Sequence, residues 1–177
     1  VELINPEYVI NTQRLDFYTD SGYSFLYGES KIVSSTSTIY CERGFYDTKS
    51  DTGYFVKKSK IDYDERTIIG DSIYFNRNTS FASANNNIKV IDTLNKTLIK
   101  GHYAEVFRLK DSVFITKRAI AIKEYRNDSI YIHADKLMVT GPPNERILRG
   151  YYNAKMYKSD LSGKADSIHM NQRSGKT

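Results

Sequence analysis

The sequence predicts an all-β domain, and three observations support this prediction. The chain of 177 residues contains 15 Tyr, 8 Phe and no Trp beside many Ile, Val and Thr, and such residues suit the half-buried surface of a sheet. Short runs of β-formers alternate with polar turn clusters, as in an antiparallel sandwich, a jelly roll or a sheet closed on itself. No stretch keeps an apolar stripe of helical period over three turns, so we expect little helix.

Most of the chain divides into short expected strands separated by polar turns. Examples of the expected strands are 37–41, 53–61, 72–75, 88–91, 112–116, 129–133 and 154–157, and the turns between them are 47–51, 62–66, 76–80, 84–87, 123–128 and 141–144. We expect residues 1–170 to form a single domain. The tail at 171–177 has no apolar residue, and we expect it to be disordered.

Two sequence markers recur within the domain. A glycine followed by two mostly aromatic residues occurs at 44–46, 101–103 and 150–152, and an Asp-Ser-Ile triplet occurs at 71–73, 128–130 and 166–168. The first two copies of both markers share an interval of 57 residues, which indicates degenerate internal repeats. Stacked amphipathic repeats of this kind would form one continuous apolar interior with open strand edges at both ends.

Strand alternation selects the residues that would line this interior. Successive side chains of a strand point to opposite faces, so residues two positions apart share a face. The candidate lining residues are three pairs at or beside the Asp-Ser-Ile triplets and a fourth pair on the strand before the second triplet: Ile73 and Phe75, Ile130 and Ile132, Ile168 and Met170, and Ile120 and Ile122.

Several of these segments resemble a known family. Residues 39–49, 69–77, 88–92, 99–104, 128–137 and 157–168 resemble the OstA-like proteins of the Bacteroidetes type, which are similar to the lipopolysaccharide-transport protein LptA and to the N-terminal domain of LptD. The resemblance covers about residues 15–170. One departure is the step Asn86-Asn87-Ile88, where the family often has Gly-Asn-Val at a hairpin; Asn tolerates positive φ better than other non-glycine residues.

The resemblance implies a fold, a ligand and a location. The fold would be a twisted β-jelly roll of two antiparallel sheets that form an open, V-shaped trough. The acyl chains of lipid A would lie along its interior, against the candidate residues named above. Copies of the chain or other lipopolysaccharide-transport proteins would add edge to edge into a bridge. The location would be the periplasm, after removal of a signal peptide, with an association to the outer membrane as a further expectation.

Other functional classes find little support in the sequence. The formal net charge is +5, and the one tight basic cluster, at 57–60, predicts at most a modest attraction to anions. The three histidines, His102, His133 and His169, lack metal-ligand spacing, and Cys41 has no partner for an internal disulfide. Motifs for a catalytic serine, a dinucleotide site and the common RNA-binding folds are absent. We therefore predict no catalytic site, metal, cofactor or nucleic-acid partner.

Two functions remain open from the sequence. The first is a non-enzymatic carrier of lipopolysaccharide, which would contain a continuous apolar trough. The alternative is a structural or adhesive β domain that self-associates through its edges and binds no lipid, which would have a fully packed interior. No apolar run approaches the ~20 residues that a membrane-spanning helix needs.

Overall fold

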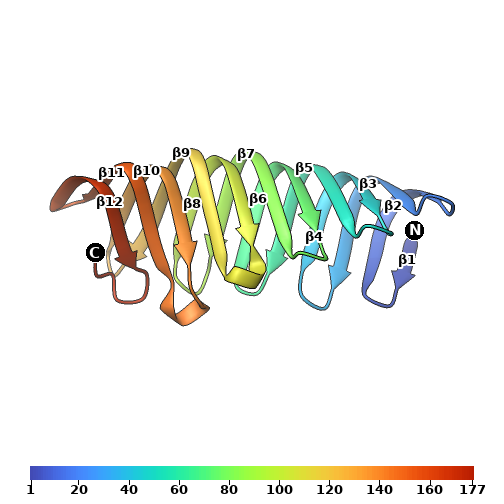
Figure 1. Ribbon diagram of the computed structural model, residues 1–177, viewed down its shortest axis with the longest axis horizontal. Coiled ribbons are helices and arrows are strands. Elements are labelled where there is room, and N and C mark those ends of the chain that lie inside the picture. The colour runs from blue at the N-terminus through green and yellow to red at the C-terminus, as the bar shows by residue number, and fades with distance from the viewer.

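The computed structural model describes residues 1–177 and is almost entirely β (Figure 1), which confirms the predicted fold class. The only helical segments are two short 3-10 turns, η1 (Arg108–Lys110) and η2 (Pro143–Glu145). Neither has the length or the apolar character to cross a bilayer. The strands are β1 (Glu2–Asn5), β2 (Tyr8–Tyr18), β3 (Tyr23–Ser34), β4 (Thr38–Asp47), β5 (Thr52–Tyr63), β6 (Arg66–Asn76), β7 (Phe81–Asp92), β8 (Thr97–Phe107), β9 (Ser112–Tyr125), β10 (Asp128–Thr140), β11 (Ile147–Lys158) and β12 (Leu161–Asn171).

All twelve strands belong to one antiparallel sheet in which every strand pairs with the next one along the chain. The strands cross the molecule obliquely in chain order, from β1 at one end to β12 at the other (Figure 1). The expected division into two sheets is not confirmed, because the hydrogen-bonded order runs unbroken from β1 to β12. The two edges of the sheet stay apart, since β1 pairs only with β2 and β12 only with β11.

The strands bend in the middle, and this bend rolls the sheet around its interior. The register of each pair from β2–β3 to β11–β12 shifts once, at a bulge. In four alternate strands the bulge holds two consecutive exposed residues of left-handed conformation, with φ between 50° and 64°. We call these four pairs the ridge: Lys57-Lys58 in β5, Asn86-Asn87 in β7, Lys117-Arg118 in β9 and Tyr152-Asn153 in β11.

Side chains on the ridge hold three of the four bends to the strand before them. The amide of Asn87 donates to Asp71 over 2.8 Å, and the amide of Asn153 donates to Asp135 over 2.7 Å. Lys58 forms an ion pair with Glu42 in the corresponding place. The left-handed conformation is costly for lysine and arginine, so the hydrogen-bonded ladders on both sides of the bulge must impose it.

Each expected strand overlaps one observed strand, but the observed strands are longer, and a bend replaces one of the expected turns. The expected turn at 84–87 is wrong. Asn86 and Asn87 do have positive φ, as their residue type suggested, yet they lie within β7 and bend it. The marker triplets also take different places: Asp71 and Asp166 lie in mid-strand, whereas Asp128 begins β10.

Candidate functional site

The interior of the rolled sheet is one apolar cluster that runs through the molecule. Thirty-one buried residues form it, from Tyr8 and Ile10 in β2 to Met170 in β12. Leu26, Phe55, Ile115 and Leu148 are among the side chains that are fully enclosed. The strand alternation of the sequence therefore produces a continuous apolar interior, and any amphipathic ligand would have to enter it.

Six of the eight candidate lining residues face this interior. Ile73, Ile130, Ile132 and Met170 belong to the buried cluster, and Phe75 and Ile168 are partly buried and pack against it. The alternation is clear at β10, where the side chain of Ile130 is 7% exposed and that of its neighbour Tyr131 is 40% exposed.

The remaining two candidates, Ile120 and Ile122, lie on the outer face of β9, so their predicted inward placement is wrong. Ala119, Ala121 and Lys123 occupy the inward positions of this strand and are buried. The physical reason is that small alanines fill the inner positions here, while the larger isoleucines remain half-buried outside. Hydrophobicity alone therefore assigned the isoleucines of β9 to the interior, where the alternating alanines lie instead.

The interior is packed rather than hollow. Two cavities among its buried side chains measure about 10 and 20 Å³, which is room for little more than single water molecules. The larger hollows lie on the surface. One of about 660 Å³ is lined by Glu7, Tyr8, Ser34, Ser35 and Arg77, among other residues. The expected open trough is thus closed in this conformation, and the contacts that close it define the candidate site.

The strand ends meet along a seam opposite the ridge. We call the turns at 77–80, 108–111 and 141–146 the arginine lip, because each contributes an arginine to the seam. The turns at 6–7 and 64–65, with the end of β7 and the 93–96 turn, form the acid lip. Both 3-10 helices belong to the arginine lip and lie along the lower edge of Figure 1.

Three arginines fasten the two lips together. Nε of Arg77 lies 3.4 Å from the Glu7 carboxylate, and its Nη2 donates to the Glu7 carbonyl over 2.9 Å. Nη2 of Arg108 lies 3.7 Å from the Asp64 carboxylate. The guanidinium groups of Arg77 and Arg108 also lie over the rings of Tyr8 and Tyr63, at 5.2 and 5.7 Å from the ring centres.

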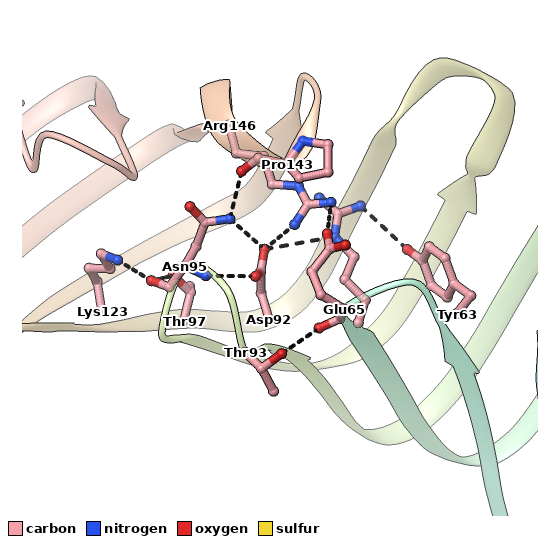
Figure 2. Close-up of polar contacts among 10 residues, drawn as sticks. Tyr63, Glu65, Asp92, Thr93, Asn95, Thr97, Lys123, Pro143 and Arg146 are labelled. Carbon is pink, nitrogen blue, oxygen red and sulfur yellow. Dashed lines mark hydrogen bonds and ion pairs between the residues drawn. The ribbon is translucent and has the colours of Figure 1, made fainter.

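The third arginine, Arg146, is the centre of a buried charge cluster (Figure 2). It forms ion pairs with Glu65 and Asp92 of the acid lip, and only 2% of its side chain is exposed. Asn95 donates to Asp92 over 3.0 Å and to the Pro143 carbonyl of the arginine lip over 3.1 Å. We call the group of Glu65, Arg66, Asp92, Lys123 and Arg146 the charge cluster.

Burial changes the titration of groups in and beside the charge cluster. Desolvation lowers the pKa of the Lys123 ammonium, whose Nζ donates to the Asn95 carbonyl. Desolvation also raises the pKa of the Tyr63 hydroxyl, which accepts a hydrogen bond from Arg66 over 3.3 Å. The cluster holds three cationic side chains against two carboxylates, and it keeps two buried donors without a partner, Nη2 of Arg66 and Nε of Arg146. Such a group favours an additional anion.

The sequence analysis did not find the seam. Its arginines occur at 77, 108 and 146: the first lies in an expected turn, the last lies two residues beyond another, and Arg108 lies outside every expected turn. Their spacing is irregular, and their acidic partners lie 44 to 81 residues away in the sequence. The one sequence signal for the seam was the presence of arginines in turns that lie at the same end of an antiparallel meander.

The rolled, bent meander has the fold of the LptA-like proteins. In the solved structures it is similar to LptH from Pseudomonas aeruginosa, described as the LptA homologous periplasmic component of the conserved lipopolysaccharide transport device. The TM-score is 0.57 at 11% sequence identity, over 62% of this chain and 78% of that chain. No family model matches the sequence, and no curated protein matches it either. The resemblance to the LptA-like proteins seen in the sequence is thereby confirmed at the level of the fold.

Proposed function

We propose that this protein is a non-enzymatic carrier of lipopolysaccharide that forms part of a bridge to the outer membrane. The main support is the LptA-like rolled sheet with an apolar interior that extends from β2 to β12. Acyl chains would lie between the lips against the inward aliphatic residues, with sugars and phosphates left in water. Each sequestered CH₂ would contribute roughly 0.8 kcal/mol of binding free energy.

The proposal includes a location and partners. The carrier works in the periplasm, and LptH, with which it shares its fold, is described as a periplasmic component. It joins other lipopolysaccharide-transport proteins, or further copies of itself, by adding strands at β1 and β12, whose outer sides have no partner strand. Residues 1–170 act as one domain in this bridge.

The packed interior favours a second candidate function. Cavities of about 10 and 20 Å³ cannot hold an acyl chain, so a carrier must open its seam to take up lipid. A structural or adhesive domain that associates through its edges needs no such opening. The two candidates therefore differ in one observable property, which is whether the seam ever admits a ligand.

Native mass spectrometry of the chain exported to a bacterial periplasm separates the two. A carrier retains glycolipid through purification, and the mass of the complex exceeds that of the chain by the mass of the lipid. Ile130→Glu, on the inner face, should abolish this additional mass, whereas Tyr131→Glu on the outer face should keep it. A wild-type chain that is always free of lipid would favour the adhesive domain.

A further inference from the structure

The structure points to a use for the seam arginines beyond closing the roll. We propose that Arg77, Arg108 and Arg146 form a binding row for the phosphate groups of an amphipathic ligand. Phosphate replaces the acid-lip carboxylates as the seam opens. This inference rests on the proposed carrier function and assigns the polar part of its ligand, whereas the interior takes the apolar part.

The seam can open without breaking the sheet. Backbone hydrogen bonds between neighbouring turns run along one side of the seam: Arg108 to Ser80 within the arginine lip, and Thr93 to Glu65 within the acid lip. Arg77 donates in the same way to Asp51, in the turn that precedes the arginine lip. None of the backbone hydrogen bonds outside the strand ladders joins the arginine lip to the acid lip. Polar contacts across the seam all involve side chains. Opening the seam therefore breaks ion pairs and packing contacts but leaves the backbone hydrogen bonds between strands intact.

The two outer arginines are accessible and loosely held. Their side chains are 22% and 26% exposed for Arg77 and Arg108, and their carboxylate partners are more than half exposed. Ion pairs in such positions contribute little to stability and exchange readily with other anions. The hollow of about 660 Å³ beside Arg77 is lined by Ser34 and Ser35 among other residues, so a phosphorylated sugar has space there.

The innermost arginine offers the stronger site once the lips part. The charge cluster around Arg146 has one more cation than carboxylates, and two of its guanidinium donors lack a partner. A phosphate accepts from two N–H groups of one guanidinium at once, and such pairs are among the strongest hydrogen bonds in proteins. Within the row, Arg146 in the buried part of the seam should therefore bind phosphate more strongly than Arg77 and Arg108 in its exposed part.

The experiment measures binding of two probes, bisphosphorylated lipid A and the same lipid after removal of its phosphates. Glu7→Gln with Asp64→Asn removes the competing carboxylates, and it should tighten binding of the phosphorylated lipid about tenfold or more. Arg77→Gln with Arg108→Gln should weaken it by a similar factor and leave the dephosphorylated lipid unaffected. The matched controls lie at the bends, away from the seam: Glu29→Gln with Glu42→Gln, and Arg43→Gln with Arg118→Gln. Their affinities for both lipids should stay within about twofold of those of the wild type.

The opening of the seam can be measured separately, as the distance between the two lips. Spin labels at the exposed Leu94 of the acid lip and Asn144 of the arginine lip, in a Cys41→Ala background, should move apart when bisphosphorylated lipid A is added. Inorganic phosphate alone should neither separate the labels nor match the affinity of the lipid. If it does both, the row binds free phosphate, and the assignment to a lipid head group is overturned.

The outcomes distinguish this inference from the proposed function. If both lipids bind and substitution of the seam arginines leaves their affinities unchanged, the phosphate row is wrong but the proposed carrier function remains supported. If binding is equal for the two lipids, or the Glu7→Gln and Asp64→Asn variant binds more weakly, the row is again overturned. If neither lipid binds to the wild type or to that variant, both the row and the carrier function fail.

Discussion

At the residue scale, Gly101 shows why a mid-strand glycine is needed. A Cβ at this position would lie 2.8 Å from the Thr116 carbonyl oxygen and would overlap the Ile115 side chain. Gly101→Ala should therefore lower the free energy of unfolding by about 1–3 kcal/mol, as for other overpacked positions. Urea unfolding measures this, with Gly163→Ala as the control, since a Cβ there meets nothing within 4 Å. Equal stability of the two variants would contradict the packing account.

The arginines of the seam should differ in their effect on stability. Arg146→Met leaves Asp92 and Glu65 without their closest cation in a buried place, and we expect a loss of about 3–5 kcal/mol. Arg77→Met removes an exposed pair and should cost less than about 1 kcal/mol. Chemical unfolding of both variants measures the difference. A small loss for Arg146→Met would mean that the charge cluster does not hold the lips together.

The buried thiol predicts a dependence of stability on alkaline pH. Burial raises the pKa of Cys41 from 9.0 to about 11, so the folded state keeps a proton that the unfolded state loses between these values. This stabilisation is present below pH 9 and is lost as the pH rises towards 11. Burial also raises the pKa of Tyr8, Tyr46 and Tyr63, which adds to the loss at higher pH.

Urea unfolding at pH 8, 9, 10 and 11 tests this dependence. The free energy of unfolding should fall over the series, and Cys41→Ala should flatten the part between pH 9 and 11. A thiol reagent should also modify Cys41 only after unfolding, because the side chain is buried. A wild-type curve identical to that of the alanine variant would contradict the assignment.

At the element scale, the presence of strands and the side chains that face inward could be predicted from the sequence more easily than the length of each strand. Alternation correctly placed Ile130 inside and Tyr131 outside. It could not show that β7 continues through Asn86 and Asn87, because a pair of asparagines suits a hairpin as well as a bulge. It also could not decide between Ala119 with Ala121 and Ile120 with Ile122 for the inner face of β9, since that depends on the space across the roll.

The edge strands should direct self-association. The outer side of β12 has no partner, so it can receive another strand. Successive N–H groups of a strand point to opposite sides, so one of Lys164→Pro and Ala165→Pro removes an outward donor and the other breaks the ladder to β11. Light scattering should show association that rises with concentration in the wild type and disappears in the folded proline variant. A wild type that stays monomeric up to millimolar concentration would contradict this prediction.

At the scale of the whole molecule, the seam is the feature that sequence patterns miss. Its contacts join residues such as Arg146 and Glu65 that lie far apart in the chain, and they form only where the rolled sheet brings its two sets of turns together. The resemblance to the LptA-like proteins predicted a trough but not that its mouth is fastened. Disorder of the 171–177 tail remains a prediction, although Gln172 is buried and its backbone N–H bonds to the Arg146 carbonyl.

The overall fold makes a simple spectroscopic prediction. Only two 3-10 turns interrupt the strands, so far-ultraviolet circular dichroism should show less than about one-fifth helix, against roughly one-third in ordinary globular proteins. A larger helical fraction would contradict the rolled sheet as a whole. The spectrum also serves as the folding control for every variant proposed above.

The most direct test of the carrier function places a photo-crosslinking amino acid at Ile130 and, separately, at Tyr131. These neighbours lie on opposite faces of β10, one in the buried cluster and one on the outer surface. In cells that make lipopolysaccharide, the account predicts crosslinks to glycolipid from position 130 and none from position 131. Crosslinks from position 131 alone, or from neither position, would contradict a lipid path through the interior.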